Sequence, residues 1–403
     1  MIKKSNKVLN RVKILMVAPT PFFTDRGTHI RILEEALSLE RRGHSVIIAT
    51  YHIGRDIPEK IKSGIKIRRI PKFLFWYKKL EAGADWQKVI LDILLIFKTL
   101  QAAFVEKPDI IHTHLHEGAL IGWIAQKIFF WRKIKLVVDF HGGLTREMIS
   151  HNYLRIGILR AFFKILEKFI GNLGDFAIVS SGELADELRK IRKGGKIETI
   201  LDGVNLENYD LLILSKKELR RELELPADKI IVVYTGSFIA NKGIGYLLEA
   251  ISEIAEKNNN IYFILAGFPA KEVKEYARKN NLENRVKLIS PLSYFDLPKI
   301  LKAGDVGVDP KDSSVGQASG KILQYMGAGL PVVCFNRANN RKYLKKGAYY
   351  ANDISARGIA DGILYFSRNS EEIIIKGKIA KERSVKFSWD KSAERIEEIY
   401  RKI

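Results

Sequence analysis

The chain has 403 residues, 46% of them hydrophobic and 28% charged, which excludes a disordered or fibrous protein and predicts two domains or one very large one. A single cysteine, Cys334, excludes an intramolecular disulfide framework, so a reducing compartment such as the cytoplasm is expected. The formal net charge of +22 favours a polyanionic partner, whether nucleic acid, an anionic membrane or a phosphorylated small molecule.

Short β-branched runs alternate with helical patterns along the chain. In the first half, strands are predicted at 13–18, 46–50, 109–114, 135–140 and 176–180, and a helix at 30–42. After a polar linker with one helix at 206–228, strands are predicted at 230–234, 261–266, 286–289, 306–308 and 332–334, and helices at 244–257 and 271–280. This alternation predicts an α/β fold with two doubly wound domains of about 200 residues each.

No membrane span or signal peptide is predicted. The apolar run at 14–19 is too short for a signal peptide. The most apolar stretch, residues 89–104, is interrupted by Asp92 and Lys98 and falls short of the roughly 18 uncharged residues that a span needs. We therefore expect a soluble or peripheral protein.

The positive charge is concentrated in the first half of the chain. Residues 1–200 contain 35 Lys and Arg against 20 Asp and Glu, whereas residues 201–403 contain 33 against 26. Two segments, 68–80 and 153–170, combine basic and bulky apolar residues, which suits an anionic membrane surface. The alternative for the second segment is an ordinary amphipathic helix packed on the sheet. The first segment contains Lys72, Phe73, Phe75, Trp76, Tyr77, Lys78 and Lys79.

The loop after the first predicted strand carries Gly27, Thr28 and His29. It lies between a strand and a helix N-terminus, where doubly wound sheets bind ligands. Because the loop does not match G-x-G-x-x-G, no nicotinamide or flavin cofactor is predicted.

Histidines follow two other predicted strands. His112, His114 and His116 alternate as metal ligands do, or belong to a strand that runs out into a cleft. Because no cysteine or carboxylate pair completes a recognisable set, no metal is predicted. His141 precedes two glycines that allow close approach of a ligand, which favours a polar role in a cleft over a place in the core.

Two segments of the second half suit an anion. Gly236 and Ser237 end a strand, and Lys242 comes just before a helix, an arrangement suited to a diphosphate. Further on, Lys321 opens a predicted helix, and Gln324 lies on the same face, within reach of a ribose hydroxyl. Residues 316–321 do not match a phosphate loop, although Ser319 and Gly320 can cap this helix.

The order of several motifs resembles a retaining glycosyltransferase of the GT-B, family 4 type, from about residue 12 to the C-terminus. The matching segments are 26–31, 42–46, 107–114, 140–142, 202–205, 235–250, 325–333 and 387–390. The resemblance implies two Rossmann-like domains facing across a cleft. Residues 1–205 would bind the acceptor and residues 206–387 the nucleotide sugar, with a C-terminal helix, 388–403, packed back on the first domain.

The resemblance also assigns site residues. His141 would lie near the transferred sugar and Lys242 on the donor diphosphate, as the catalytic residues. Ser237 stands where the family often has arginine, and Gln324 where a glutamate is expected to hold the donor ribose, its partner glutamate falling near Gly316. A branch of the family has lysine at the position of Lys321, which would restore the missing charge. The implied acceptor residues are Gly27, Thr28 and His29, and the donor residues are Gly236, Ser237, Gly267, Gly320, Lys321 and Gln324.

The predicted function is transfer of a sugar from a nucleotide-sugar co-substrate to a glycan or lipid-linked acceptor, with retention at the anomeric carbon and with neither cofactor nor metal. Lys242, Lys321 and the Ser237 hydroxyl would stabilise charge on the leaving diphosphate, together with the helix N-terminus at Gly320. The first alternative is a non-catalytic GT-B scaffold or partner subunit. A nucleic-acid-binding protein is disfavoured, because the charges form no recognisable module. The expected location is the cytoplasm, with the cytoplasmic face of an anionic membrane as a further candidate.

Overall fold

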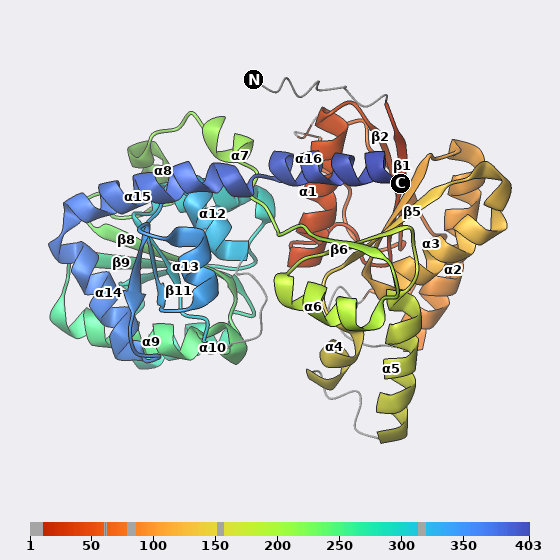
Figure 1. The fold of residues 1–403 in the computed structure, drawn as a ribbon. Coiled ribbons are helices and arrows are strands. Elements are labelled where there is room, and N and C mark those ends of the chain that lie inside the picture. Colours follow the sequence, from red (N-terminus) through yellow and green to blue (C-terminus); the bar gives the residue numbers. More distant parts are fainter. Residues whose placement is uncertain (1–10, 60, 62, 79–85, 151–156, 313–319) are drawn as a thin grey trace, which may run out of the picture. The chain divides into compact units, whose positions relative to one another are not determined.

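The computed structural model describes residues 11–403 apart from 60, 62, 79–85, 151–156 and 313–319. The chain divides into two units, one formed by Met1–Asp202 and Trp389–Ile403 and the other by Gly203–Ser388. Each unit is built around its own parallel sheet with helices packed against it (Figure 1). The prediction of two doubly wound α/β domains is confirmed.

The sheet of the first unit has the order β3-β2-β1-β4-β5-β6-β7. The strand order reverses between β1 and β4, and the carboxyl ends of strands beside such a reversal are where ligands bind in this fold class. The strands are β1 (Lys13–Ala18), β2 (Ser45–Thr50), β3 (Lys66–Arg69), β4 (Ile110–His114), β5 (Lys135–Phe140), β6 (Phe176–Val179) and β7 (Lys196–Thr199). The helices are α1 (Gly27–Arg41), α2 (Trp86–Glu106), α3 (Leu115–Ile128), η1 (Phe130–Arg132), α4 (Leu144–Ser150), α5 (Gly157–Gly171), α6 (Gly182–Ile191) and α16 (Trp389–Lys402).

The central strands of this sheet are apolar along nearly their whole length. Strands β1, β2 and β5 are buried at every position but the first. Helices cover both faces of such a parallel sheet, so its strands lack the apolar–polar alternation of a half-exposed sheet. Polar residues in these strands are therefore exceptional, and those at the ends of β4 and β5 form the site described below.

Helix α16 belongs to the first unit although it ends the chain. It packs along α1 (Figure 1), where Arg41 and Arg42 form ion pairs with Asp390 at 2.9 Å and Glu397 at 2.7 Å. Glu397 also contacts His44 Nε2 at 2.9 Å. The first unit is therefore built from the segments that precede and follow the second unit in the sequence.

The second unit has a six-stranded parallel sheet of the order β10-β9-β8-β11-β12-β13, with the corresponding reversal between β8 and β11. Its strands are β8 (Ile230–Ser237), β9 (Ile261–Phe268), β10 (Val286–Ile289), β11 (Val306–Asp309), β12 (Val332–Phe335) and β13 (Ala348–Ala351). Its helices are α7 (Glu207–Asp210), α8 (Lys216–Glu222), η2 (Ala240–Lys242), α9 (Ile244–Lys257), α10 (Lys271–Lys279), η3 (Tyr294–Asp296), α11 (Leu297–Ala303), α12 (Gly320–Ala328), α13 (Ala338–Leu344), α14 (Ala356–Arg368), α15 (Ser370–Ser384) and η4 (Val385–Phe387).

The structure departs from the predicted elements at a few places. The sequence patterns miss the edge strands β3, β7 and β13, and the polar stretch at 206–228 holds two helices, α7 and α8, rather than one. Among the described residues, no helix is long and apolar enough to cross a membrane.

Candidate functional site

Basic side chains gather at the carboxyl ends of β8 and β11 in the second unit. Lys321, in the first turn of α12, has its Nζ 3.5 Å from Asp309 Oδ1 and 4.0 Å from the centroid of the Tyr234 ring. Within the described part of the chain, this buried ammonium makes no hydrogen bond. The pKa of Lys242 is lowered to about 8, mainly by burial and also by the charges of Lys311 and Lys321, which outweigh the opposing charge of Asp309. The region therefore holds more positive than negative charge, as an anion site requires.

Glycines allow the loops of this region to approach one another closely. A Cβ on Gly267, at the end of β9, would lie 1.7 Å from the carbonyl oxygen of Gly236. A Cβ on Gly243 would lie 1.9 Å from the Pro310 oxygen, and its φ of +76° also favours glycine. Gly267 is thus required for backbone packing, whether or not it touches a ligand.

The remaining predicted donor residues lie around the same strand ends. Ser237 is the exposed last residue of β8, and Gly320 is the first residue of α12. Residues 313–319, which include Gly316 and the predicted cap Ser319, lie outside the described residues. Gln324 accepts a hydrogen bond at its Oε1 from the Tyr209 hydroxyl, 2.7 Å away, so its amide is held in place by α7.

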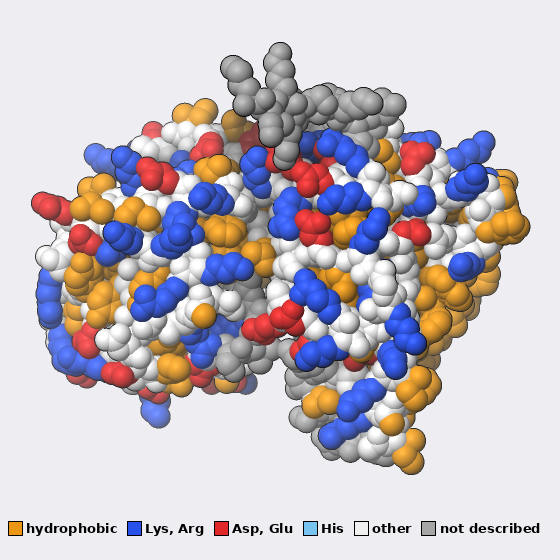
Figure 2. Space-filling view, viewed as in Figure 1, with side chains coloured by type: hydrophobic (Ala, Val, Ile, Leu, Met, Phe, Trp, Pro, Cys, Tyr) orange, Lys and Arg blue, Asp and Glu red, His pale blue; other side chains and the backbone are white. Residues whose placement is uncertain are grey.

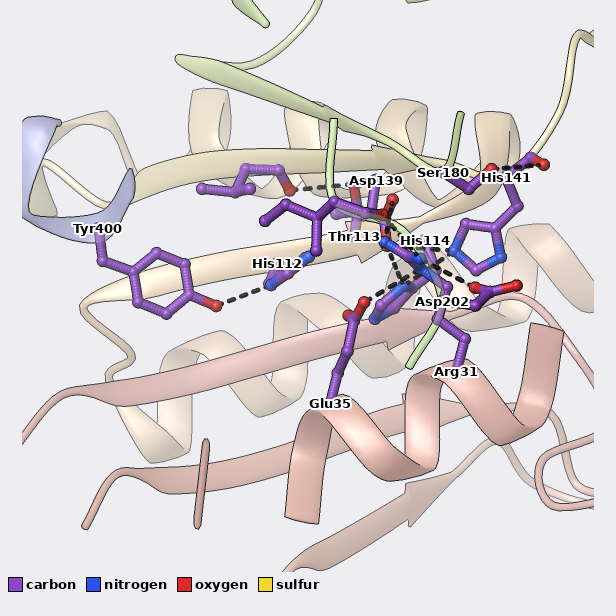
Figure 3. Close-up of polar contacts among 12 residues, drawn as sticks. Arg31, Glu35, His112, Thr113, His114, Asp139, His141, Ser180, Asp202 and Tyr400 are labelled. Atoms are coloured by element: carbon purple, nitrogen blue, oxygen red, sulfur yellow. Dashed lines mark hydrogen bonds and ion pairs between the residues drawn. The ribbon is translucent and has the colours of Figure 1, made fainter. Parts of the chain in front are cut away.

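In the first unit, His141 lies directly after β5 and contacts two buried side chains. Its Nε2 is 3.3 Å from Asp139 Oδ2 and 3.3 Å from His114 Nδ1 (Figure 3). The Ser180 hydroxyl donates a hydrogen bond to the His141 carbonyl at 3.1 Å. The ring nitrogen Nδ1 has no hydrogen-bond partner among the residues that the structure describes. These contacts fix the ring and leave Nδ1 to bind or accept a proton.

Arg31 is the centre of a buried ion network beneath His141. Its guanidinium, from α1, contacts Asp139 at 2.9 Å, Glu35 at 3.0 Å and Asp202 at 3.0 Å (Figure 3). Burial alone would raise the pKa of the Asp139 carboxyl, but Arg31 and His141 outweigh it and hold that pKa well below its usual range. Burial raises the pKa of Glu35 well above its usual range, against the opposing charge of Arg31. The network holds Asp139 ionised below His141.

Two of the three alternating histidines lie in the same cluster. His112 and His114, on β4, stack with ring centroids 4.9 Å apart, and His112 Nδ1 is 2.7 Å from the Tyr400 hydroxyl. Burial lowers the pKa of His114 to about 4 and that of His112 well below its usual range, so both rings are neutral at pH 7. His116 lies apart from them, against the ring of Phe140 at 4.8 Å.

The predicted acceptor residues lie at the start of α1. Gly27 is its first, exposed residue, and Thr28 is half-buried. His29 is buried and hydrogen-bonded to the Thr24 hydroxyl, and burial lowers the pKa of its imidazole to about 3. A neutral His29 can bind a ligand only through hydrogen bonds.

Two family models match this chain, each over one unit for most of its length. Residues 26–208 match Glycosyltransferase Family 4, and residues 215–383 match Glycosyl transferases group 1. The chain belongs to the family 4, group 1 glycosyltransferases. It is therefore a nucleotide-sugar-dependent enzyme of the retaining hexosyltransferase class, as the motifs predicted.

Relatives of this glycosyltransferase match it along most of its length. A D-inositol 3-phosphate glycosyltransferase from Saccharomonospora viridis is 22% identical. The match covers 93% of this chain and 89% of the relative. The structure of a sucrose-phosphate synthase from Thermosynechococcus elongatus has a TM-score of 0.77 at 20% identity, covering 97% of this chain and 99% of that one. Anabaena HepE, in complex with UDP and glucose, has a TM-score of 0.72 at 18% identity, covering 98% and 100%. These neighbours establish the GT-B fold.

Sequence reasoning missed several charged residues of both clusters in this glycosyltransferase. Arg31 and Glu35 lie four residues apart on one buried face of α1, and that spacing is the signal that could have found them. Asp139 interrupts an otherwise apolar buried strand. Asp309 likewise ends a buried strand in the second unit. A carboxylate at the carboxyl end of a buried parallel strand was the available cue in both units.

Proposed function

We propose that the second unit binds the diphosphate of a nucleotide sugar through Lys242 and Lys321, with Ser237 and the N-terminus of α12 as further donors. The observation that carries this proposal is the excess of lysine charge at the carboxyl ends of β8 and β11, where Lys321 Nζ makes no hydrogen bond to any described residue. A bound diphosphate would offset the repulsion that lowers the pKa of Lys242. Gln324, fixed by Tyr209, would bind the donor ribose through its amide.

The same residues account for chemistry at the donor. Breaking the bond between the sugar and the diphosphate builds negative charge on phosphate oxygens. Ammonium groups already in place stabilise that charge without reorganisation. The acceptor hydroxyl attacks from the face that the leaving group departs from, and its proton passes to the departing phosphate. We propose that His141, with its unpartnered Nδ1, contacts the transferred sugar, and that Gly27, Thr28 and His29 bind the acceptor.

Donor binding is tested by the thermal midpoint of the full chain in the presence of UDP-, GDP- and ADP-sugars. UDP-glucose is the first donor to test, because HepE was solved with UDP and glucose. A donor at 100 times its Kd adds about 2.7 kcal/mol to the unfolding free energy. Lys321→Ala should remove most of this stabilisation, whereas Lys274→Ala, an exposed lysine on α10, should not. If no sugar nucleotide raises the midpoint, the non-catalytic scaffold is the better account.

We further propose that the acceptor is presented at an anionic membrane. The first unit exposes large apolar side chains on three helices and on the segment before α2, and Figure 2 shows apolar side chains along the side that carries α2 and α5. Tyr77 is buried and does not belong to this surface, contrary to the sequence-based expectation. The exposed residues are Phe73, Phe75, Trp76, Trp86, Val89, Ile93, Phe97, Phe104, Val105, Phe130, Trp131, Ile158, Phe162, Ile165 and Phe169.

Basic residues accompany these apolar side chains. Lys72, Lys78, Lys164 and Lys168 are exposed among them, whereas Lys79 and residues 153–156 lie outside the described residues. Each Lys or Arg near an anionic surface contributes about 1 kcal/mol, and aromatic rings favour the interface. Helix α5 exposes most of its apolar residues, which disfavours the alternative that it packs fully on the sheet.

Liposome co-sedimentation tests the membrane proposal. Binding should rise with the fraction of anionic lipid, fall with salt, and weaken at least tenfold when Lys72, Lys78, Lys164 and Lys168 become glutamate. Glutamate at four exposed lysines of the second unit, Lys217, Lys271, Lys274 and Lys279, gives the same charge change as a control. If the wild type stays in the supernatant with anionic liposomes at low salt, the membrane proposal is wrong and the donor proposal is unaffected.

A further inference from the structure

The buried cluster beneath His141 contains metal-ligating atoms without a hydrogen-bond partner. Among the described residues, neither oxygen of Glu35 accepts a hydrogen bond, although Oε1 lies 3.0 Å from Arg31 Nε, and the Nε2 atoms of His112 and His114 have no partner. All three side chains are at most 1% exposed. Glu35, His112, His114 and Asp139 each offer one ligand atom within 4.8 Å of the others. Unpaired polar atoms at this depth are costly, so their convergence calls for a ligand.

Charge points to a cation as that ligand. Three carboxylates, Glu35, Asp139 and Asp202, surround the single guanidinium of Arg31. Arg31 occupies Glu35 Oε1 and both oxygens of Asp139, but no contact engages Glu35 Oε2. The alternative is a Glu35 that carries a proton and stays neutral.

We propose that Glu35, His112, His114 and Asp139 bind one divalent transition-metal ion, with zinc as the expected ion. Imidazole nitrogens and carboxylate oxygens are both zinc ligands, and two of each supply the four ligands of a tetrahedral ion. This proposal departs from the expectation, based on sequence alone, that the chain binds no metal. It does not rest on the proposed donor site, which lies in the other unit.

The contacts of the other ring nitrogens support the same assignment. His112 Nδ1 contacts the Tyr400 hydroxyl at 2.7 Å, and His114 Nδ1 lies 3.5 Å from Asp139 Oδ2 and 3.3 Å from His141 Nε2. Metal-ligating histidines usually have the second nitrogen fixed by such a partner, which orients Nε2 toward the ion. The ion would join α1, β4 and β5 directly below His141 and so act as a positioning element.

The two alternatives predict opposite effects of one substitution. If Glu35 binds a metal, Glu35→Gln loses a ligand and lowers the thermal midpoint of protein purified with its metal. If Glu35 is a neutral carboxyl with no ion, Glu35→Gln and Glu35→Leu keep or raise the midpoint, because no charged form has to be buried. His116→Gln is the matched control, since His116 lies outside the cluster.

Metal content gives an independent measurement. The full chain is unfolded with a chelator and refolded with ZnCl2, CoCl2 or MgCl2, because the buried cluster loads during folding. We expect about one zinc or cobalt per chain, a visible absorption band for cobalt, and a midpoint about 5 °C or more above that of protein refolded without metal. Glu35→Gln should reduce the bound metal at least tenfold, while His116→Gln should retain it.

The proposal is overturned if the wild type binds less than about a tenth of an equivalent of zinc or cobalt after refolding and Glu35→Leu is as stable as the wild type or more so. Equal metal binding by wild type and Glu35→Gln would also overturn it, because the metal would then lie elsewhere. Nucleotide-sugar affinity should be the same in both proteins, which separates this result from any failure of the donor site.

Discussion

The two polar clusters of the molecule differ in how their charges are balanced. In the first unit, Arg31 is buried and contacts three carboxylates at about 3 Å. In the second, Lys242, Lys311 and Lys321 influence one another beside the carboxylates of Asp309 and Asp312. The first cluster fixes helices and strands to one another, whereas the second keeps an excess of positive charge that only a ligand can neutralise. The balance of charge thus distinguishes a cluster that fixes the fold from the one that we propose binds a diphosphate.

The largest effect is expected from Arg31→Met, which leaves the buried Asp139 carboxylate without its guanidinium partner. Removing one partner of a buried ion pair costs about 3–5 kcal/mol of unfolding free energy. Chemical denaturation of the full chain measures it. Arg357→Met is the control, because Arg357 forms its ion pairs at an exposed site and should cost less than about 1 kcal/mol. Equal costs for the two variants would show that the buried network does not stabilise the first unit.

Lys242→Ala should affect the reaction and not the fold. Losing a donor that stabilises developing charge costs about 2.7–4 kcal/mol, or a factor of about 10² to 10³ in kcat. Initial rates of sugar transfer, or of donor hydrolysis, provide the measurement, with Lys274→Ala as the matched control. Activity within threefold of the wild type would remove Lys242 from the mechanism.

The lowered pKa of Lys242 predicts a pH dependence of donor binding. With a pKa of about 8, the ammonium is charged at pH 6–7 and loses its proton as the pH rises past 8. Donor affinity should fall over that range, and binding near pH 8 should take up a proton, because the diphosphate raises the pKa of Lys242 again. Calorimetric titration in buffers of different ionisation enthalpy measures the uptake. Lys242→Ala should flatten the profile, and an unchanged profile in this variant would assign the titration to another group.

A smaller effect is expected from Gln324→Glu. A carboxylate accepts hydrogen bonds from ribose hydroxyls about twice as strongly as a neutral amide, which amounts to about 1 kcal/mol. Donor Kd should fall several-fold, provided that the Tyr209 hydroxyl still donates to the new side chain. Tyr209→Phe, alone and combined with Gln324→Glu, shows whether the two side chains act together. Unchanged affinity with no transfer by either form would favour a non-catalytic scaffold.

The sequence predicts the central strands of both sheets because these are buried on both faces. Residues 13–18 and 135–140, which form β1 and β5, are strands with the predicted bounds, and so is the half-buried edge strand β10 at 286–289. The missed strands lie at the edges, where this cue fails: β3 alternates exposed and half-buried residues, β7 has no fully buried residue, and β13 contains only Ala and Tyr. Edge strands are short and carry charge because one side faces solvent, so their composition resembles that of a loop.

The residues of the candidate sites also differ in how well the sequence predicts them. Lys242, Lys321 and His141 follow recognisable motifs at strand ends and could be selected from sequence. The spacing of Arg31 and Glu35 could have singled out Glu35, but not its place beside His112 and Asp139, which are more than 70 residues away and are brought to it only by the sheet. The spacing of residues along the sequence can predict contacts within one helix or one loop. It cannot predict a cluster built from α1, β4 and β5, because that cluster depends on the order of the strands in the sheet.

The two ends of the second unit, at residues 203 and 388, lie next to each other. Val204 donates its N–H to the Phe387 carbonyl at 2.9 Å, and Val204 pairs with Ser388 as a parallel bridge. The second unit is therefore an insertion whose two ends lie next to each other, and it could be removed or exchanged as a continuous cassette. A short linker from Asp202 to Trp389 would close the gap and keep α16, with Tyr400 bonded to His112, on the remaining half. A cut after residue 202 would instead discard the helix that completes the first unit.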